Sequence, residues 1–324
     1  MNPEISSRIS NESVDGLQAK NLSHKQSEDL FKIIENRKEK IISRRNLPYA
    51  TVDYQLELLE QLTQFGLGRF LLERGGLNGF WTDYAIRHPK LGRLSGVNNE
   101  NKPFSSLESF LLNRAPTALA TQQRFEIVKK EIQKFIADDI TFASIPCGLM
   151  AELLELDYSN VSKFSLVGID IDLESFKHVE HVAKEKKLFD HCEFIVKDAW
   201  DLKIDNEFDL ITSHGLNIYE SSEERVVILY RQFFNALKPH GRLITSFLTP
   251  PPGLQVKTEW NLDKVHLPDA QLQKLLFVDI LEGKWQFFRS AEQSTQQLKN
   301  AGFIDIEIIY DESHIFPTIV AIKP

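Results

Sequence analysis

The residues with the clearest chemical potential form one turn and an acidic position that follows it. The turn Ser144–Met150 joins an apolar run to a helical pattern, and Gly148 inside it lets a ligand approach the backbone closely. The free N–H groups at the start of the helix favour an anionic group there. Asp170 ends a second apolar run 22 residues after Gly148, where a carboxylate can accept hydrogen bonds from both hydroxyls of a ribose. A plain turn at Gly148 and a helix N-cap at Asp172 are the structural alternatives.

Further polar residues follow the next apolar runs. Asp198 closes one run, and Ser213 and His214 close the run after it. His214 is the only titratable residue at that tip, and the near-neutral pKa of an ordinary imidazole suits a general base. A histidine that is hydrogen-bonded to the local turn is the alternative. Tyr219, in the same loop, either orients a substrate or packs at the entrance of the next helix.

The elements that must position these residues lie between residue 138 and the end of the chain. Short, nearly continuous apolar runs predict seven strands, at residues 140–145, 164–171, 192–196, 208–212, 243–248, 304–309 and 316–322. Helical patterns separate most of them, at residues 150–156, 173–188, 223–237 and 291–301. Such strands predict an α/β fold with a doubly wound, mostly parallel seven-stranded sheet. The last two strands are too close in sequence for a crossover helix, so we expect an antiparallel hairpin. Ligands bind at the carboxyl ends of the parallel strands, where the polar residues fall.

The first part of the chain has a different pattern. Residues 46–137 predict an N-terminal all-helical subdomain, with apolar stripes such as Leu56, Leu59 and Leu62, and a long helix that begins at Pro116. Residues 1–45 predict a flexible tail followed by a short surface helix. Residues 138–324 form the α/β domain, within which residues 250–289 are an excursion between core elements.

Composition narrows the class of protein. The chain has 324 residues with 38 Lys and Arg against 46 Asp and Glu, and this net charge of −8 argues against a nucleic-acid partner. No apolar run approaches the roughly 20 residues that span a bilayer, and residues 1–6 do not resemble a secretory signal. Two cysteines are too few for a disulfide framework or a four-ligand zinc site, and His178 and His181 fit a solvated helix face better than a metal site. We therefore expect a cytoplasmic protein without a metal, membrane or nucleic-acid partner.

From about residue 138 to 324 the sequence resembles the class I, Rossmann-like S-adenosylmethionine-dependent methyltransferases, in the small-molecule type with an N-terminal helical cap. The resemblance rests on the order of short motifs: the turn at Gly148, Val-Gly-Ile-Asp at 167–170, Lys-Asp-Ala at 197–199, Phe-Asp-Leu-Ile at 208–211, Leu-Lys-Pro-His-Gly-Arg-Leu at 237–243 and Ala-Gly-Phe at 301–303.

The resemblance implies S-adenosylmethionine as the cofactor. It implies that Gly148 and its neighbours lie against the methionine part, that Asp170 holds the ribose, and that Ile171 packs on the adenine. Asp198 would accept from the adenine amino group, and the backbone N–H of Ala199 would reach the ring. The implied cofactor-binding positions are Ser144, Pro146, Cys147, Gly148, Asp170, Ile171, Asp198, Ala199 and Ser213.

The first motif departs from the family pattern. It usually reads acid-x-Gly-x-Gly-x-Gly, whereas the corresponding residues here are Ser144, Pro146, Gly148 and Met150. Pro146 has no N–H to donate, Met150 restricts the turn, and Ser144 cannot supply a carboxylate near the cofactor's ammonium group. A catalytically silent, methyltransferase-like binding or scaffold protein is therefore the alternative to an enzyme.

The resemblance also indicates where a methyl acceptor would bind. In this fold the acceptor lies beyond the fourth and fifth predicted strands, so His214 and Tyr219 are the candidate catalytic residues. The excursion at 250–289 and aromatic residues of the helical cap are candidates for the roof of the acceptor pocket, and ordinary core packing is the alternative for each aromatic. The motifs of nucleobase amino-methylating enzymes and of nicotinamide enzymes are absent. The predicted reaction is methyl transfer to oxygen or nitrogen of a small organic acceptor.

Overall fold

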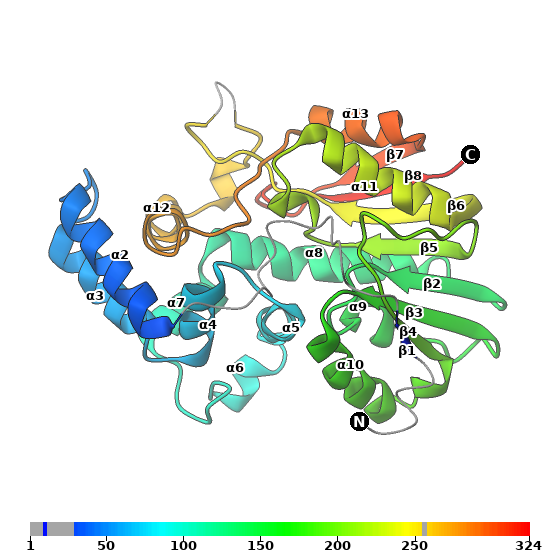
Figure 1. Cartoon of the computed structure of the whole chain (residues 1–324), viewed down its shortest axis with the longest axis horizontal. Helices are drawn as coiled ribbons and strands as arrows, with labels where there is room; N and C mark the ends of the chain where they lie inside the picture. The colour runs from blue at the N-terminus through cyan, green and yellow to red at the C-terminus, as the bar shows by residue number, and fades with distance from the viewer. Residues whose placement is uncertain (1–8, 12–28, 255–257) are drawn as a thin grey trace. The chain divides into compact units, whose positions relative to one another are not determined.

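The computed structural model describes residues 9–11, 29–254 and 258–324 (Figure 1). These residues divide into two compact units. The sheet unit comprises strand 9–11, the described part of Gln123–Trp260, and Phe287–Pro324. The helical unit comprises the described part of Leu22–Gln122 together with Asn261–Gln286. Among the described helices, none is long and apolar enough to cross a membrane.

The sheet unit contains one mixed sheet with the strand order β1-β4-β3-β2-β5-β6-β8-β7. Its strands are β1 (Ile9–Asn11), β2 (Ile140–Ser144), β3 (Phe164–Asp170), β4 (Cys192–Val196), β5 (Phe208–Ser213), β6 (Leu237–Ser246), β7 (Ile304–Ile309) and β8 (Thr318–Ile322). The pairs from β1 to β6 are parallel, and β8 pairs antiparallel with both β6 and β7. The doubly wound, mostly parallel seven-stranded sheet with a C-terminal antiparallel hairpin is therefore confirmed.

Strand β1 is an addition to the predicted sheet. It pairs in parallel with β4, with Ile9 opposite Phe194, although the sequence predicted a tail over residues 1–45. The rest of that predicted tail before residue 29 lies outside the described residues. Three residues are too few to show a period, and the free N–H and C=O groups at the edge of β4 supply the partner instead.

Helices on the sheet unit are shorter than their sequence patterns in several places. They are α9 (Ala151–Leu154), α10 (Leu173–Glu185), α11 (Glu223–Ala236) and α13 (Ala291–Ala301), with 3-10 turns η1 (Phe189–His191) and η2 (Asn217–Tyr219). Helices α11 and α13 pack against each other, as Figure 1 also shows. The long helix α8 (Pro116–Gln133) begins in the helical unit, and from Gln123 onward it belongs to the sheet unit.

The helical unit begins before the predicted cap and ends earlier than it, at Gln122, and it also includes residues 261–286. It contains α2 (Leu30–Arg44), α3 (Val52–Leu62), α4 (Gly66–Arg74), α5 (Gly79–Arg87), α6 (Gly92–Ser95), α7 (Ser106–Asn113), η3 (Leu262–Lys264), α12 (Leu267–Lys274) and the π-helical turn η4 (Leu275–Ile280). Side chains of Thr51, Asn78 and Ser105 accept N–H bonds at the starts of α3, α5 and α7, which explains why these helices begin there.

The structure corrects the boundaries 46–137 that the sequence predicted for the cap. Helix α2 belongs to the helical unit because Ile41 is buried in its core and Arg44 donates hydrogen bonds to Gln55 and to the carbonyl of Asp279. Residues 261–286, predicted as part of the acceptor-pocket excursion, also belong there. Local periodicity cannot reveal such pairings, because they join segments more than 200 residues apart.

The aromatic residues of the helical unit form part of its core. Trp81 packs edge-on against Phe80 and Tyr84, and its ring lies 5.9 Å from that of Phe70. Trp81 is buried in the apolar cluster of this unit. Core packing, the alternative that the sequence offered for each aromatic, therefore describes Trp81 within the helical unit.

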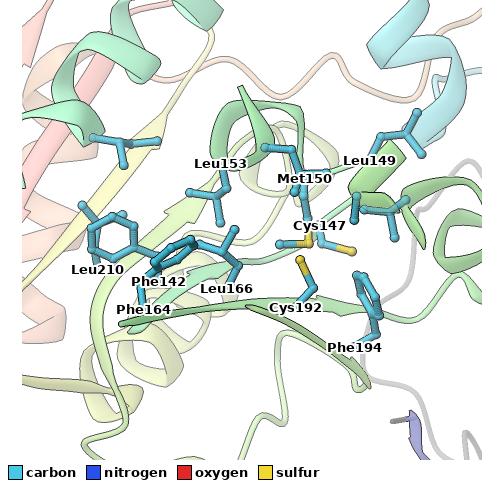
Figure 2. Packing of buried hydrophobic residues seen from close by; sticks show 14 of the residues in the cluster. Phe142, Cys147, Leu149, Met150, Leu153, Phe164, Leu166, Cys192, Phe194 and Leu210 are labelled. Atoms are coloured by element: carbon cyan, nitrogen blue, oxygen red, sulfur yellow. The ribbon is translucent and has the colours of Figure 1, made fainter. Parts of the chain in front are cut away.

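The core of the sheet unit explains the glycine in Val-Gly-Ile-Asp. Figure 2 shows Met150, Cys147 and Leu153 gathered over the side chains of strands β2, β3 and β4. A Cβ atom on Gly168 would lie 2.7 Å from Met150 Sδ and 3.0 Å from Phe194 Cδ1. Met150 is fully buried here, so its side chain fills the core behind the turn. The absence of a side chain at Gly168 therefore leaves the space that the side chain of Met150 occupies.

We predict that Gly168→Ala lowers the free energy of unfolding by about 1–3 kcal/mol, because the added methyl group overpacks this core. Urea denaturation would measure the change. Ser165→Ala, at an exposed position of the same strand, is the matched control and should stay within about 0.5 kcal/mol of wild type. In a double-mutant cycle, Gly168→Ala should cost less in a Met150→Ala background than in wild type, because the clash with Met150 Sδ is then absent. Equal stability of Gly168→Ala and wild type would contradict the packing argument.

Candidate functional site

The turn after β2 is tied to the end of β3 by two backbone donors. The N–H of Cys147 donates to the carbonyl of Ile169 at 2.9 Å, and the N–H of Gly148 donates to Asp170 Oδ2 at 3.0 Å. Gly148 has a φ of +48°, in the left-handed region where glycine carries no steric penalty. The two positions singled out in the sequence therefore meet directly, at the carboxyl edge of the sheet.

Asp170 is a buried carboxyl group, and each of its two oxygens accepts a hydrogen bond from a backbone N–H group. Its Oδ1 accepts the N–H of Asp172 at 3.0 Å, while Oδ2 accepts the N–H of Gly148. Asp170 is 8% exposed, and burial raises its pKa to about 6, although the backbone hydrogen bonds oppose that shift. Asp172 occupies the position immediately before α10, and its Oδ2 accepts from the Ser175 hydroxyl at 3.0 Å. Asp170 is thus not needed as the cap of α10.

Asp198 lies at the same edge, two residues beyond the end of β4. Asp170 pairs with Val196 in the β3–β4 register, so Asp198 follows directly along the neighbouring strand. Its Oδ1 accepts the N–H of Trp200 at 2.9 Å, which closes a tight turn through the buried Ala199. Gly148, Asp170 and Asp198 therefore follow the ends of three neighbouring strands, β2, β3 and β4.

A buried carboxylate that the sequence did not single out lies beside Ser144. Glu152, in the first turn of α9, accepts the hydroxyl of Ser144 at 2.5 Å and that of Thr212 at 2.9 Å, both on Oε1. Ser144 and Thr212 are register partners on β2 and β5, so one carboxylate bridges the two central strands. Burial raises the pKa of Glu152, while its hydrogen bonds and the charge of Arg124 oppose the shift.

This geometry changes how the departures in the first motif are understood. The acid missing at Ser144 is present as Glu152, eight residues later, and is hydrogen-bonded to Ser144 itself. Met150 has a φ of +50°, and its buried side chain points into the core. Pro146 is the departure that remains, because proline has no backbone N–H to donate to a ligand. A glutamate in an apolar stretch, Met150–Leu154, was the one sequence signal that could have identified this group.

His214 lies just beyond β5, where the sequence placed it, but its environment differs from the expected one. Its Nδ1 lies 3.5 Å from the hydroxyl of Ser246 on β6, and its Nε2 is buried with no hydrogen-bond partner among the described residues. Burial, followed by the charge of Arg124, lowers the pKa of His214 well below its ordinary value. The imidazole is therefore neutral at physiological pH, and the near-neutral pKa expected for a general base is not found.

The loop after β5 is held by a buried arginine. Arg289 is 2% exposed and donates to the carbonyls of Asn217 at 2.8 Å and Glu220 at 2.6 Å. These carbonyls flank Tyr219, the last residue of η2, so its backbone position is fixed. Ser213 is buried, and its carbonyl accepts from Thr245 at 2.8 Å, so it acts within the sheet. The roles predicted for Tyr219 and Ser213 stay predictions.

Comparison with known proteins agrees with this arrangement. The family model of the methyltransferase domain matches residues 144–241, from the end of β2 into β6. Residues 144–241 therefore belong to the methyltransferase domain family, and the sheet that contains them has the Rossmann-like methyltransferase fold.

Solved structures include one close relative and more distant ones. A possible exported protein from Bordetella parapertussis is 38% identical over 91% of this chain and 95% of its own, with a TM-score of 0.85. A methyltransferase from Methanosarcina mazei is 18% identical over 60% of this chain and 96% of its own, with a TM-score of 0.43. Magnesium protoporphyrin IX methyltransferase from Synechocystis PCC 6803 is 14% identical over 75% and 100%, with a TM-score of 0.48. No curated protein sequence matches the chain.

We predict that Glu152→Ala lowers the free energy of unfolding by about 1–3 kcal/mol, because two buried hydroxyls lose their shared acceptor. Glu152→Gln should keep most of that stability, since an amide oxygen accepts from both hydroxyls without a buried charge. Urea denaturation at pH 7 measures both variants, with the exposed Glu193→Ala as the control. If Glu152→Ala unfolds at the same urea concentration as wild type, the carboxylate does not link β2 to β5.

Proposed function

We propose that this protein binds S-adenosylmethionine and transfers its methyl group to oxygen or nitrogen of a small organic acceptor. The observation that carries the proposal is the direct hydrogen bond between Gly148 and Asp170 at the carboxyl edge, with Asp198 on the neighbouring strand end. This edge is where doubly wound sheets bind their ligands. The match to the methyltransferase domain over the same residues supports it.

The residues at this edge fit the cofactor chemically. An ionised carboxylate has about four acceptor sites, and Asp170 uses two of them for backbone N–H groups, which leaves capacity for the two ribose hydroxyls. Asp198 would accept from the adenine amino group, with Ile171 and Ala199 beside the ring. Gly148 and Cys147 would lie along the methionine part. When bound, the cofactor supplies a methyl group that is activated by a sulfonium centre.

The acceptor would bind beyond β5 and β6, near His214. Its unpartnered Nε2 supports a hydrogen bond to the acceptor, which would fix how the acceptor is oriented toward the methyl group. A neutral imidazole with a low pKa is a weak base, so orientation is the main role we assign to it. The 3.5 Å approach of Ser246 to Nδ1 would hold the ring in place.

The first experiment is a calorimetric titration of the protein with S-adenosylmethionine and S-adenosylhomocysteine. We expect micromolar affinity, on the order of −8 kcal/mol, and loss of binding in Asp170→Ala. Binding would then justify an acceptor screen with labelled cofactor. Absence of binding at millimolar ligand, with or without acceptor candidates, would favour the catalytically silent binding or scaffold protein.

The raised pKa of Asp170 predicts how cofactor binding depends on pH. Ribose hydroxyls donate to the ionised carboxylate, so the group must lose its proton, and affinity for S-adenosylhomocysteine should fall roughly tenfold per pH unit below pH 6. Above pH 7 the affinity should be constant. Calorimetry between pH 5 and 8 measures this dependence, and Asp170→Asn should bind weakly with no inflection near pH 6. An inflection that persists in Asp170→Asn would assign the titration to another group.

We predict that His214→Ala lowers turnover roughly tenfold, which corresponds to the loss of about one hydrogen bond to the acceptor. Affinity for S-adenosylhomocysteine should stay within about twofold of wild type, because His214 lies beyond β5 and away from Asp170 and Asp198. Single-turnover kinetics with an acceptor from the screen measures the first quantity. His181→Ala, on an exposed helix face, is the control. Unchanged turnover of His214→Ala would remove this residue from the reaction.

A further inference from the structure

A buried arginine interrupts the apolar face of α8. Val128 and Ile132 of this helix are buried in the core against β2, β5 and β6, and Arg124 lies one turn earlier. Arg124 is only 6% exposed. Its guanidinium carbon lies 3.9 Å from the ring centre of Phe316, and Nη1 donates to Ser246 Oγ at 3.2 Å. The guanidinium group of Arg124 therefore lies at the border of the apolar core, beside the carboxyl end of β6.

Arg124 has few partners for a buried guanidinium. Within the described part of the chain, its one hydrogen bond goes to Ser246 and no carboxylate forms an ion pair with it, although a guanidinium has five N–H donors. The two acids that act on it through space are occupied elsewhere. Asp311 accepts from Ser313, Ile315 and Phe316 of its own loop, and Glu152 Oε1 accepts from two hydroxyls. Burial lowers the pKa of Arg124 to about 10, so it stays charged at neutral pH.

Two other buried polar atoms lie around the same serine. Thr318 pairs with Ser246 in the β6–β8 register, so both side chains lie on one face of the sheet, and Thr318 Oγ1 is buried without a partner. His214 Nε2 is also unpartnered, while its Nδ1 faces Ser246. Since Ser246 accepts from Arg124, its own hydroxyl proton is free for Nδ1, and in the tautomer in which Nδ1 accepts that proton Nε2 carries the ring hydrogen and is a donor. His214 and Thr318 therefore each bring one buried unpartnered polar atom to Ser246, and Arg124 brings a charged group with one hydrogen bond among the described residues.

We propose that Arg124, His214 and Thr318 bind a carboxylate of the methyl acceptor, so that the acceptor is a small carboxylic acid. This inference rests on the proposed function and names its substrate class. Unsatisfied buried donors are costly, and a bound anion would satisfy them. The group lies at the ends of β5, β6 and β8, whereas Gly148, Asp170 and Asp198 follow β2, β3 and β4. The negative charges of Glu152 and Asp311 near Arg124 favour a monoanion over a doubly charged phosphate.

The test compares matched ligands that differ in charge. Protein saturated with S-adenosylhomocysteine is titrated with acetate, hexanoate, benzoate and phenylacetate, and with the carboxamide of each, by calorimetry and ligand-observed NMR. We expect at least one acid to bind roughly tenfold more tightly than its amide, the effect of one charge-assisted pair. Arg124→Gln should abolish that preference. Arg242→Gln is the matched control, because Arg242 also stacks on an aromatic ring, that of Phe135, at 4.1 Å.

Thr318→Val gives a second readout that does not depend on how Arg124→Gln folds. Valine has the shape of threonine and removes the unpartnered hydroxyl, so the melting temperature should hold or rise while carboxylate affinity falls severalfold. A purely structural hydroxyl would leave carboxylate affinity unchanged, and that result would overturn its place in the subsite.

The outcomes separate this inference from the proposed function. If wild-type protein does not bind S-adenosylhomocysteine, the proposed function fails first. If S-adenosylhomocysteine binds but no acid is preferred over its amide, the carboxylate subsite is wrong. If Arg124→Gln weakens S-adenosylhomocysteine binding as strongly as acid binding, Arg124 serves the carboxylate of the cofactor, and the proposal for the acceptor is overturned.

Discussion

The hydrogen bond from Gly148 to Asp170 is the constraint on which the candidate site depends. It joins the turn after β2 to the end of β3, and it fixes the carboxylate that also accepts from Asp172. The turn can come this close because Gly148 adopts a left-handed conformation and because Met150 turns its side chain into the core over Gly168. The packing behind the turn and the polar groups in front of it are therefore parts of one arrangement.

A second layer of polar residues lies at the carboxyl edge above the apolar core. Glu152 links Ser144 to Thr212, and Arg124 reaches Ser246 beside His214. Charges in this layer act over short distances with little water, so they shift one another's pKa values strongly. Burial, and then the charge of Arg124, lowers the pKa of His214, and the same cation would influence the choice of acceptor.

The sequence was sufficient for the features that depend on local patterns. Continuous apolar strands predicted the sheet, and the 22-residue spacing brought Asp170 beside Gly148, because parallel strands end at the same edge. Glu152 and Arg124 were missed since neither belongs to a motif, and their importance comes from burial next to distant residues. The pKa of His214 depends on Arg124, 90 residues earlier in the chain. The extent of the helical unit likewise depends on residues 261–286, which no periodicity connects to α2.

The short strand β1 has a consequence for behaviour in solution. A parallel sheet that ended at β4 would present a row of unpaired backbone groups, to which another chain could add and start aggregation. Ile9–Asn11 covers part of that row. At the other end of the sheet, β7 carries exposed acidic residues at Asp305 and Glu307, whose charge repels a second copy. Both borders of the sheet thus carry features that disfavour the addition of a further strand.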